Sequence, residues 1–483
     1  MARNIKLFEN KVQELKYRVL REVAVQTWRG NDVFAEFNEI ADKVVDKNDP
    51  PQRCCIYKDR AVIAERIRLA IGGSKKNPSV VQVIDIACDE CPQAGYIVTD
   101  MCRGCLAHYC QESCKLNAIT YENHRAHINK SICVDCGRCA KACPYSAIHN
   151  FKRPCERACE VNAISMGEGG EAQIDPEKCV SCGSCVYHCP FGATVDVSNI
   201  VDVIRLIKEN AWQTGSKVVA IVAPSIGSQF SFASVGQIIA GIRGLGFDQV
   251  YEVALGADMV AEKEGKELVE KGMLTTSCCP AFVRLIETQY PELKDKVSHN
   301  FSPMAELASF IKAAHPEYHI IFIGPCIAKK AEARRPEVAK FVDYVITYEE
   351  LMALWDSKNI RLAEQEEEVW DQASCFGRGF AQSGGVTKAV EQTLGELGAD
   401  FPLDPIACNG LAECKTALNK LKRGVLPNNF VEGMACIGGC IGGRGNMIKY
   451  SEAIPKSMTQ HENDATTKEV LASIEKNSPT VLK

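Results

Sequence analysis

Apolar residues follow helical spacing in the first part of the chain. In residues 4–45, Leu15, Val19 and Val23 recur every four positions, which predicts one or two amphipathic helices. The stretch DKNDPPQR, at 46–53, interrupts this pattern with two prolines. A further helix is expected over KDRAVIAERIRLAIGG, because a glycine pair ends it.

The pattern after Val201 alternates between short apolar runs and helical stretches. KVVAIVAPSIG and YHIIFIGPC each indicate a buried strand followed by a loop. DYVITYEELMALW indicates a strand and a helix, with Thr347 and Glu350 spaced as a capping box. Helical spacing is found near 258–271, 280–290, 303–315 and 385–398. This alternation predicts an α/β domain with parallel sheets flanked by helices, whose functional loops follow the strands.

These changes divide the chain into four expected parts. They are an N-terminal helical segment (1–79), a cysteine-rich domain (80–200), the α/β domain (201–455) and a tail (456–483). The cysteine-rich part has few apolar residues for a core, so bound metal is expected to supply much of its stability.

Cysteine is the unusual feature of the composition. The chain has 26 cysteines, and 16 of them fall between Cys88 and Cys189. The net charge of −5 and the lack of a dense Lys/Arg run argue against a nucleic-acid partner. The apolar runs are too short to cross a membrane, and the N-terminus has no secretory pattern. We therefore expect a cytoplasmic protein, in which clustered cysteines bind metal rather than form disulfides.

Two cysteine segments repeat one motif. CVDCGRCAKACP and CVSCGSCVYHCP both carry C-x2-C-x2-C-x3-C-P, the signature of two-cluster ferredoxins, in which each fourth cysteine ligates the other cluster. This assigns one 4Fe–4S cluster to Cys133, Cys136, Cys139 and Cys189, and a second to Cys179, Cys182, Cys185 and Cys143. Zinc is the alternative metal, but three close thiolates before a proline-flanked fourth favour iron–sulfur.

Eight further cysteines in this region follow looser versions of the motif. By analogy, a third cluster would take Cys102, Cys105, Cys110 and Cys159, and a fourth Cys88, Cys91, Cys155 and Cys114. The alternative is that some of them are core thiols. Such a series of clusters would conduct single electrons at low potential.

Three more cysteine segments lie in the α/β part. They are TSCCPAF (276–282), GPCIAKKAE (324–332) and EGMACIGGCIGGRG (432–445), and each follows an apolar strand-like run. Four of their cysteines could bind another 4Fe–4S cluster, and the glycines beside Cys436 and Cys440 would let the backbone approach it closely. Together the three segments resemble the signature motifs of FeFe hydrogenases, and the ferredoxin-like part resembles the accessory domain of that family.

The resemblance implies a six-iron H-cluster between two lobes of the domain. Its cubane would be held by Cys279, Cys326, Cys436 and Cys440, with Cys440 bridging to a diiron unit that carries CO, cyanide and azadithiolate ligands. Residues that would enclose the diiron unit are Ala223, Pro224, Ser225, Ser302, Lys329, Phe380 and Met434. Lys329 would pair with a cyanide, as a short ammonium can. Solvent exposure for Lys329 and core packing for the others are the alternatives.

The resemblance also implies a proton relay. Cys278 would stand beside the bridging amine, and Glu264, Glu267, Ser298 and Glu332 would lead to the surface. Thiols and buried carboxyl groups can exchange protons near neutral pH. The alternative for Glu264 and Glu267 is an exposed helix, since ADMVAEKEGKELVEKG has that composition.

Several residues depart from the best-known enzymes of the family. Phe282 replaces a tryptophan, Gly324 a methionine and Met304 a glutamine, and GRGN stands at 443–446. With CCIYKDRA at 54–61, these changes resemble the group B branch. Cys54, Cys55, Cys375, Cys408 and Cys414 have no assigned role, and burial as apolar thiols is expected.

The expected activity is reversible reduction of protons to hydrogen, with electrons from a ferredoxin-like carrier and a diiron unit built by maturation proteins. A hydrogen sensor is one alternative, which the retained Cys278 and the absence of a recognisable signalling domain disfavour. A non-catalytic iron–sulfur assembly or electron-transfer protein is another, which the full set of cysteines with Lys329 disfavours.

Overall fold

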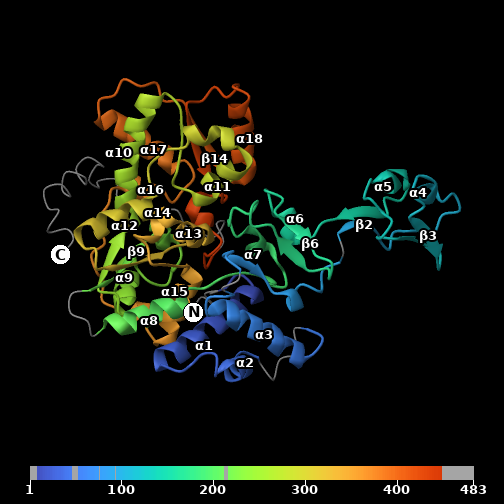
Figure 1. The fold of residues 1–483 in the computed structure, drawn as a ribbon, viewed down its shortest axis with the longest axis horizontal. Helices are drawn as coiled ribbons and strands as arrows, with labels where there is room; N and C mark the ends of the chain where they lie inside the picture. Colours follow the sequence, from blue (N-terminus) through green and yellow to red (C-terminus); the bar gives the residue numbers. More distant parts are fainter. Residues whose placement is uncertain (1–7, 46–52, 75–76, 93, 212–215, 449–483) are drawn as a thin grey trace, which may run out of the picture.

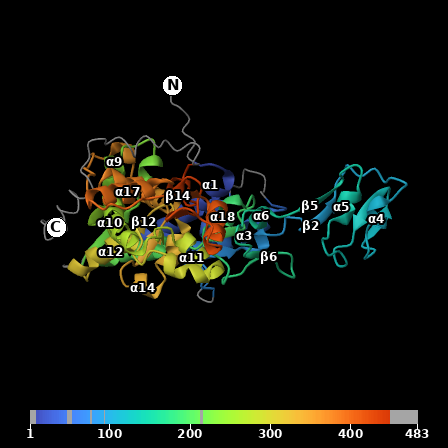
Figure 2. The ribbon, with the colours of Figure 1, turned by 90° about the horizontal axis from the view of Figure 1, so that it is seen from above.

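A computed structural model describes residues 8–45, 53–74, 77–92, 94–211 and 216–448, so the tail expected at 456–483 lies outside the described residues. Most of the chain forms one large body. Residues 95–151 form a small module that projects from this body in two perpendicular views (Figure 1, Figure 2). None of the described helices is both long and apolar enough to span a membrane.

A four-stranded parallel sheet lies inside the body. Its strands are in the order β10 (Gln249–Glu252), β9 (Val218–Val222), β12 (His319–Ile323) and β13 (Tyr344–Ile346). Every residue of β9 is buried. Alternate residues of β9 face two separate cores, with Ala220 in one and Ile221 in the other, as strand geometry requires. The predicted strands in KVVAIVA, YHIIFI and DYVI are therefore confirmed.

A second parallel sheet of three strands forms the other lobe. Its order is β11 (Leu274–Thr275), β15 (Phe430–Met434) and β14 (Pro405–Asn409). Val431 faces a core formed with α11 (Pro280–Gln289) and α18 (Leu411–Lys422). Phe430 faces α10 (Val253–Lys271) and α17 (Gly385–Glu396). Helices cover both faces of both sheets (Figure 1), which confirms the predicted α/β class.

The helices largely follow the sequence pattern. The stretches predicted near 280–290, 303–315 and 385–398 are α11, α12 (Pro303–Ala314) and α17. The helix predicted from residue 258 begins at Val253, because the apolar residues after β10 are buried in the helix itself. The capping box that begins α15 (Tyr348–Ser357) is confirmed, since Thr347 and Glu350 bond each other's backbone N–H groups. The α/β domain also contains α9 (Val235–Gly244), α13 (Ile327–Glu332), α14 (Pro336–Ala339) and α16 (Cys375–Gly379).

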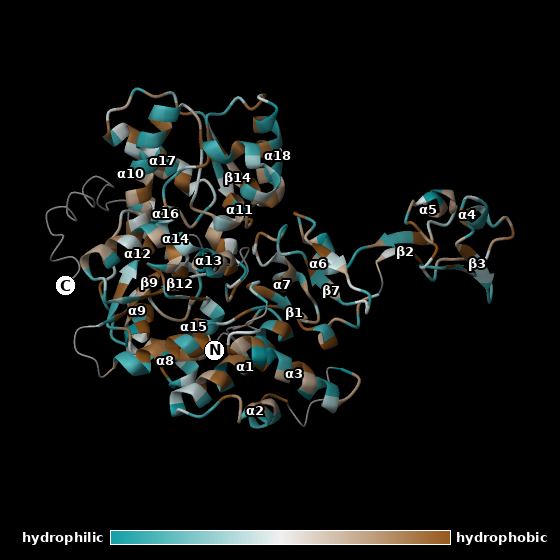
Figure 3. Cartoon of the chain, viewed as in Figure 1, coloured by the Kyte–Doolittle hydropathy of each residue, from teal (hydrophilic) through white to brown (hydrophobic). Residues whose placement is uncertain are grey.

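The N-terminal helices share a core with the α/β domain. They are α1 (Lys11–Arg29), α2 (Phe37–Val44) and α3 (Ile56–Ala70). Val23 and Ile67 pack in the same cluster as Ile204 of α8 (Ile200–Asn210) and Trp355 of α15. Hydrophobic and hydrophilic residues occur on the same helices there (Figure 3), as expected for helices that cover a core. The segment therefore does not fold around a core of its own.

The cysteine-rich region contains two modules of similar topology. In each, the first strand pairs with the last, and an antiparallel hairpin and two short helices lie between them. We call residues 95–151 the inserted module, and residues 81–92 with 153–198 the body module. The inserted module has β2 (Gly95–Val98), α4 (Tyr109–Glu112), β3 (Ile119–Glu122), β4 (Arg125–Ile128), α5 (Arg138–Ala142) and β5 (Ile148–Phe151). The body module has β1 (Val81–Val83), α6 (Pro154–Arg157), β6 (Ile164–Met166), β7 (Ala172–Ile174), α7 (Ser184–His188) and β8 (Thr194–Asp196).

Candidate active site and iron–sulfur modules

Three cysteine-bearing loops leave the carboxyl ends of strands in both sheets. Cys278 and Cys279 follow β11, and Cys279 caps α11. Cys326 follows β12 and caps α13. Cys436 and Cys440 follow β15. Because β12 belongs to one sheet and β11 and β15 to the other, the loops meet between the two lobes.

A cavity of about 80 Å³ lies where these loops meet. The thiol-bearing residues on its wall are Cys278, Cys279, Cys326 and Cys440. Of the residues expected to enclose a diiron unit, the wall includes Ala223, Pro224, Lys329, Phe380 and Met434. The cavity is thus small, largely apolar and supplied with thiols from two sheets.

Ser225 and Ser302 lie next to the wall of this cavity. Each is a chain neighbour of a wall residue, Pro224 or Pro303. The Ser225 hydroxyl bonds the Tyr348 hydroxyl at 2.7 Å. The Ser302 side chain caps α12 by accepting a hydrogen bond from its backbone. Both hydroxyls therefore have structural partners, and their expected role toward a diiron unit stays a prediction.

The four cysteines expected to hold a cubane are close together. Cys326 interacts electrostatically with Cys279, Cys436 and Cys440, and burial raises the pKa of the Cys326 thiol well above its usual range. Burial likewise raises the pKa of Cys440 to about 11. In the described part of the chain, no three metal-ligating side chains stand close enough for a single ion. A donor set of four thiols at wider spacing fits an iron–sulfur cubane, whose irons would stabilise the thiolates.

Cys278 is buried beside a carboxyl group. Burial, and after it the neighbouring Glu264, raises the pKa of the Cys278 thiol well above its usual range. Glu264 is itself fully buried. Its Oε1 accepts hydrogen bonds from the backbone N–H and the hydroxyl of Ser277, at 3.2 and 3.3 Å. Burial raises the pKa of Glu264 to about 7, although these hydrogen bonds and Ser298 oppose the shift.

The chain of polar groups continues from Glu264 to the surface. Ser298 lies near Glu264 but donates its hydroxyl hydrogen to Oε2 of Glu267 at 3.0 Å, and Oε2 of Glu264 has no hydrogen-bond partner among the described residues. Glu267 also accepts from Lys271 at 2.6 Å and from the backbone N–H of His299 at 3.1 Å, and His299 is exposed. The structure thus brings Cys278, Glu264, Ser298 and Glu267 near one another, and their role as a relay stays a prediction. Glu264 and Glu267 lie on α10, where Glu264 is buried and Glu267 is partly buried, so this face of the helix is not exposed.

Glu332 lies elsewhere. Its Oε2 is 2.7 Å from Nζ of Lys329, on the same helix, α13. Lys329 also donates to the backbone carbonyl of Cys278 at 3.3 Å. Burial alone would lower the pKa of Lys329, but Glu332 and the nearby thiols raise it above its usual value. The expectation that Glu332 joins the relay is therefore not supported by its contacts: its described partner is Lys329, which is buried and not a solvated surface lysine.

The departures from better-known relatives have different surroundings. Met304 lines the cavity, whereas Phe282 packs in the core beneath it with Leu285. A side chain at Gly324 would meet the ring of Phe322 at 2.5 Å, and Phe322 lines the cavity. The Phe322 ring thus fills the space in the cavity wall that a side chain at position 324 would otherwise take.

The glycine-rich loop before Cys440 is shaped by packing against protein. Gly439 has a φ of 74°, and a Cβ there would meet the backbone of Ala381 and Ser383 within 3 Å. In the structure Gly439 lets the loop pack on the segment that follows α16. The close approach to an inorganic centre that was expected of the glycines here stays a prediction.

The sixteen cysteines of the two modules follow a fourfold repeat. Four of them accept a backbone hydrogen bond, at 3.2 or 3.3 Å, from an alanine four residues later: Cys114, Cys143, Cys159 and Cys189. In each case a residue with positive φ stands between the two, and a strand follows. The looser motifs therefore adopt the same local structure as the two regular ones.

The cysteines group within each module, and not between modules. In the inserted module Cys114 lines one pocket with Cys133, Cys136 and Cys139. Cys143 packs in the same small core as Cys102 and Cys110. The predicted pairings of Cys189 with Cys133 and of Cys159 with Cys102 are therefore wrong, because the β2–β5 ribbon holds these cysteines away from the body (Figure 1).

The body module groups its eight cysteines into two further sets. Cys185 lies near Cys179, Cys182 and Cys159. Cys155 lies near Cys88 and Cys189, and Cys91 lies near the same two. The predicted pairings of Cys143 with Cys179 and of Cys114 with Cys88 are thus also wrong. Cys182 interacts electrostatically with Cys436, so the set around Cys179 is the one next to the cavity.

Residues 216–444 match the family model described as "Iron only hydrogenase large subunit, C-terminal domain". This region is therefore similar to the FeFe hydrogenase family. Residues 153–193 match a "4Fe-4S dicluster domain" and residues 125–148 a "4Fe-4S binding domain", in agreement with two separate modules. The chain therefore combines ferredoxin-type domains with a C-terminal FeFe hydrogenase domain.

Individual relatives are distant. Iron hydrogenase 1 of Clostridium pasteurianum is 29% identical over 47% of this chain and 50% of its own length, so the chain spans about half of that relative. The cytosolic Fe-S cluster assembly factor NAR1 of Eremothecium gossypii is 32% identical over 32% of this chain and 37% of its own. A solved FeFe-hydrogenase variant from Chlamydomonas reinhardtii has a TM-score of 0.49 at 24% identity, over 59% of this chain and 94% of its own.

Some site residues are not evident from the sequence. Ser277 holds Glu264, and Phe322 walls the cavity, yet each falls inside a segment that a cysteine motif or a buried strand already accounts for. Ser277 could have been found from its position directly before Cys278. Phe322 could not, because strand alternation alone does not show which face meets the cavity.

Proposed function

We propose that this chain is a hydrogenase that catalyses reversible reduction of protons to H2 at an H-cluster held by Cys279, Cys326, Cys436 and Cys440. The observation that carries the proposal is the joint placement of two features at one small apolar cavity. Its wall holds thiols from both lobes, and Cys278 on that wall lies near the buried Glu264, with Ser298 and Glu267 close to Glu264 on the side of the exposed His299. When bound, the H-cluster would supply the redox-active iron at which electrons and protons combine.

The protein's own groups would then move protons and exclude water. Cys278 would give its proton to the bridging amine of the bound diiron unit. It would regain a proton from Glu264, whose pKa of about 7 suits exchange near neutrality. Ser298 and Glu267 would connect Glu264 to solvent. Lys329 would donate a hydrogen bond to an anionic ligand of the diiron unit, while Phe380 and Met434 exclude water.

We further propose four accessory 4Fe–4S clusters, one in each set of four cysteines. Electrons would pass from the inserted module, through the body module, to the set around Cys179 that borders Cys436. With six irons at the active site, the loaded protein would contain about 22 irons.

The proposed electron partner is a small acidic carrier, such as a ferredoxin, that docks on the inserted module. Several large apolar side chains are exposed there, among them Met101, Leu106 and Val134 at 62, 97 and 68%. Residues 95–151 carry six Lys and Arg against four Asp and Glu, whereas the whole chain has a net charge of −5. Apart from the cluster ligands, the side chains of this module thus carry a small net positive charge, which would favour docking of an acidic partner here over the rest of the chain.

We also infer a place in the group B branch, from Phe282, Gly324 and Met304 together. Maturation proteins would have to install the diiron unit.

The test is hydrogen evolution by protein matured with a synthetic or enzymatically built diiron unit and supplied with a reduced low-potential donor. We expect H2 production, with CO and cyanide bands in the infrared spectrum. An assembly protein related to NAR1, the second candidate suggested by that match, would bind iron–sulfur clusters but show neither the bands nor H2. Absence of both after maturation would sink the hydrogenase proposal.

A further inference from the structure

Three arginine side chains surround one set of cysteines in the body module, Cys88, Cys91, Cys155 and Cys189. Arg66 lies on α3, Arg153 precedes α6, and Arg53 precedes α3. Arg66 and Arg153 are only 4 and 2% exposed. Buried guanidinium groups are rare unless a negative charge accompanies them.

Arg153 reaches directly over the loop that carries Cys88 and Cys91. Its Nη1 donates to Sγ of Cys88 at 3.7 Å. Its Nη2 donates to the carbonyl of Cys91 at 3.3 Å, and its Nε to the carbonyl of Pro92 at 3.2 Å. All the described side-chain bonds of Arg153 therefore point at this one loop.

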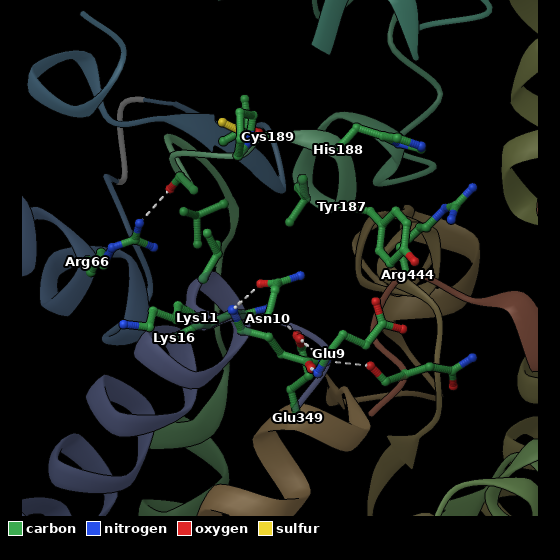
Figure 4. A pocket seen from close by; sticks show the side chains of 18 residues that line it. Glu9, Asn10, Lys11, Lys16, Arg66, Tyr187, His188, Cys189, Glu349 and Arg444 are labelled. Atoms are coloured by element: carbon green, nitrogen blue, oxygen red, sulfur yellow. Dashed lines mark hydrogen bonds and ion pairs between the residues drawn. The ribbon is translucent and has the colours of Figure 1, made fainter. Parts of the chain in front are cut away.

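Arg66 approaches the same set at Cys189. Its Nη2 donates to the carbonyl oxygens of Gly192 at 2.8 Å and Phe191 at 3.3 Å, just after Cys189. Arg66 and Cys189 line one cavity of about 470 Å³ between α1, α3 and α7 (Figure 4). Burial lowers the pKa of Arg66 to about 10, which leaves it charged at neutral pH.

Two of these three arginines, Arg66 and Arg153, have no acid beside their guanidinium groups among the described residues. Among the described residues, neither Arg66 nor Arg153 makes an ion pair, and Nε of Arg66 has no hydrogen-bond partner. Arg53 has carboxylates only at 3.7 and 3.8 Å, from the half-exposed Asp89 and Glu90. The carbonyl oxygens that hold these groups carry no net charge. What remains to balance them is an anion held by the four thiolates.

The set of cysteines around Cys179, which lies next to the small cavity between the two lobes, has a different environment. Near Cys179, Arg284 is partly exposed and 3.6 Å from Glu287. Near Cys182, Arg444 is partly exposed and stacks on Tyr187 at 4.6 Å. In the inserted module, Arg138 is exposed. Buried, unpaired cations are thus concentrated at the Cys88 set.

We propose that Arg53, Arg66 and Arg153 raise the reduction potential of the cluster held by Cys88, Cys91, Cys155 and Cys189, and make it the accessory cluster that is reduced first. One-electron reduction adds one negative charge to the cluster, and a nearby cation in a poorly solvated site stabilises that charge. The inference rests on the proposed four clusters, and it does not depend on the hydrogen chemistry. The cluster would store an electron between the inserted module and the active site.

The experiment is an EPR-monitored redox titration of the full-length iron-loaded protein. In Arg66→Gln and in Arg153→Gln we expect the signal of highest potential to move downward, with about a tenfold lower ratio of reduced to oxidised cluster at fixed potential, or 59 mV for one electron. Arg66→Lys, which keeps the charge, should restore most of the potential. The matched control is Arg157→Gln, a loss of the same charge from the exposed side of α6, and it should leave the titration unchanged.

Cys88→Ser assigns the signal, because it should remove the component of highest potential and about four irons. Survival of that component in Cys88→Ser, together with the loss of about four irons, would overturn the proposal, because a different cluster would then have the highest potential. An equal shift in Arg157→Gln, or no shift in either buried variant with iron content intact, would also overturn it. If Cys88→Ser changes neither iron content nor any signal, the assignment of a cluster to this set fails instead, which separates the two ideas.

Discussion

Cys278 and Cys279 are adjacent in the chain but belong to different networks. Cys279 caps α11 and lies near Cys326 and Cys440, which are two of the other residues proposed to hold the cubane. Cys278 lies near Glu264, which begins the series that leads to the surface. Two residues joined by one peptide bond can thus serve different roles, Cys279 in electron delivery and Cys278 in proton delivery. This is possible because the loop ends at Cys279 and α11 begins directly after it.

Cys278→Ala tests the proton role at this position. We expect turnover of the matured protein to fall by about 100-fold or more, the range typical of a lost general acid. Iron content and infrared bands should stay unchanged, because Cys278 is not among the expected ligands. The control is Cys54→Ala, which removes an exposed thiol far from the cavity. Wild-type turnover in Cys278→Ala would refute the relay.

Glu264→Gln tests the next group. Because the pKa of Glu264 in the folded protein is about 7, against a usual value of 4.5, the folded protein holds an extra proton between these values. Stability from this group is therefore present below about pH 4.5 and is lost as pH rises toward 7. We expect Glu264→Gln to lose turnover at all pH values without losing melting temperature at pH 8. A lower melting temperature together with unchanged turnover would contradict this assignment.

At the scale of secondary-structure elements, the sequence predicted the features that have a regular pattern, such as apolar runs and motifs of fixed spacing. The apolar runs identified β9 and β12 because a strand buried on both faces needs an uninterrupted run. The capping box at Thr347 was evident because its spacing is fixed. The position of the cysteine segments in loops that follow strands could be predicted for the same reason.

The pairing of the accessory cysteines could not be predicted in the same way. The four motifs are nearly alike, so a fourth cysteine fits any of them locally. The deciding contact is the pairing of β2 with β5 and of β1 with β8, over three or four residues each. Strands this short have no pattern that identifies a partner. The role of Glu332, which was expected from the family resemblance, stays a prediction, because its contact with Lys329 identifies an ion pair and does not test a relay.

Excision of the inserted module tests the grouping of cysteines within modules. Gly95 and Phe151 are paired across the β2–β5 ribbon, so a short Gly/Ser linker can replace residues 96–150. We expect iron content to fall by about eight, from about 22 to about 14, with hydrogen evolution from a small chemical donor retained. Reduction by an acidic protein carrier should be lost.

A pairing of cysteines across the two modules gives a different outcome, since excision would then disrupt all four clusters. Loss of the EPR signals of the body module in the shortened protein would therefore favour that pairing. A matched variant, Leu106→Ser with the module kept, should weaken only the reaction with the carrier, because Leu106 is 97% exposed.

At the scale of the whole molecule, a buried set of charges joins three parts of the chain. Asp196, at the end of β8, bonds Lys16 of α1 at 2.5 Å and Lys330 of α13 at 2.8 Å. Lys330 also bonds Glu350 of α15 at 2.8 Å, and Lys16 bonds Glu349. The body module, the N-terminal helices and the helix that carries Lys329 are thus held by one network.

Asp196→Asn should weaken this junction strongly, because it leaves two buried ammonium groups with one carboxylate fewer. Breaking such a pair typically costs about 3–5 kcal/mol. We expect the urea midpoint at pH 7, followed by fluorescence of the buried Trp355 nearby, to fall accordingly. Arg361→Gln, which breaks an exposed pair with Glu364, should change it by less than about 1 kcal/mol.

The effect of Asp196 should also depend on pH in one direction. Burial alone would raise the pKa of Asp196, but Lys16 and Lys330 hold it well below its usual value of 3.8. A depressed carboxyl pKa gives stability that is present above the unfolded value and is lost as pH falls toward the folded one. The difference between the parent protein and Asp196→Asn should therefore be constant from pH 7 to about 5 and shrink below pH 4. A difference that instead grew on acidification would show that the carboxylate is not held ionised at this junction.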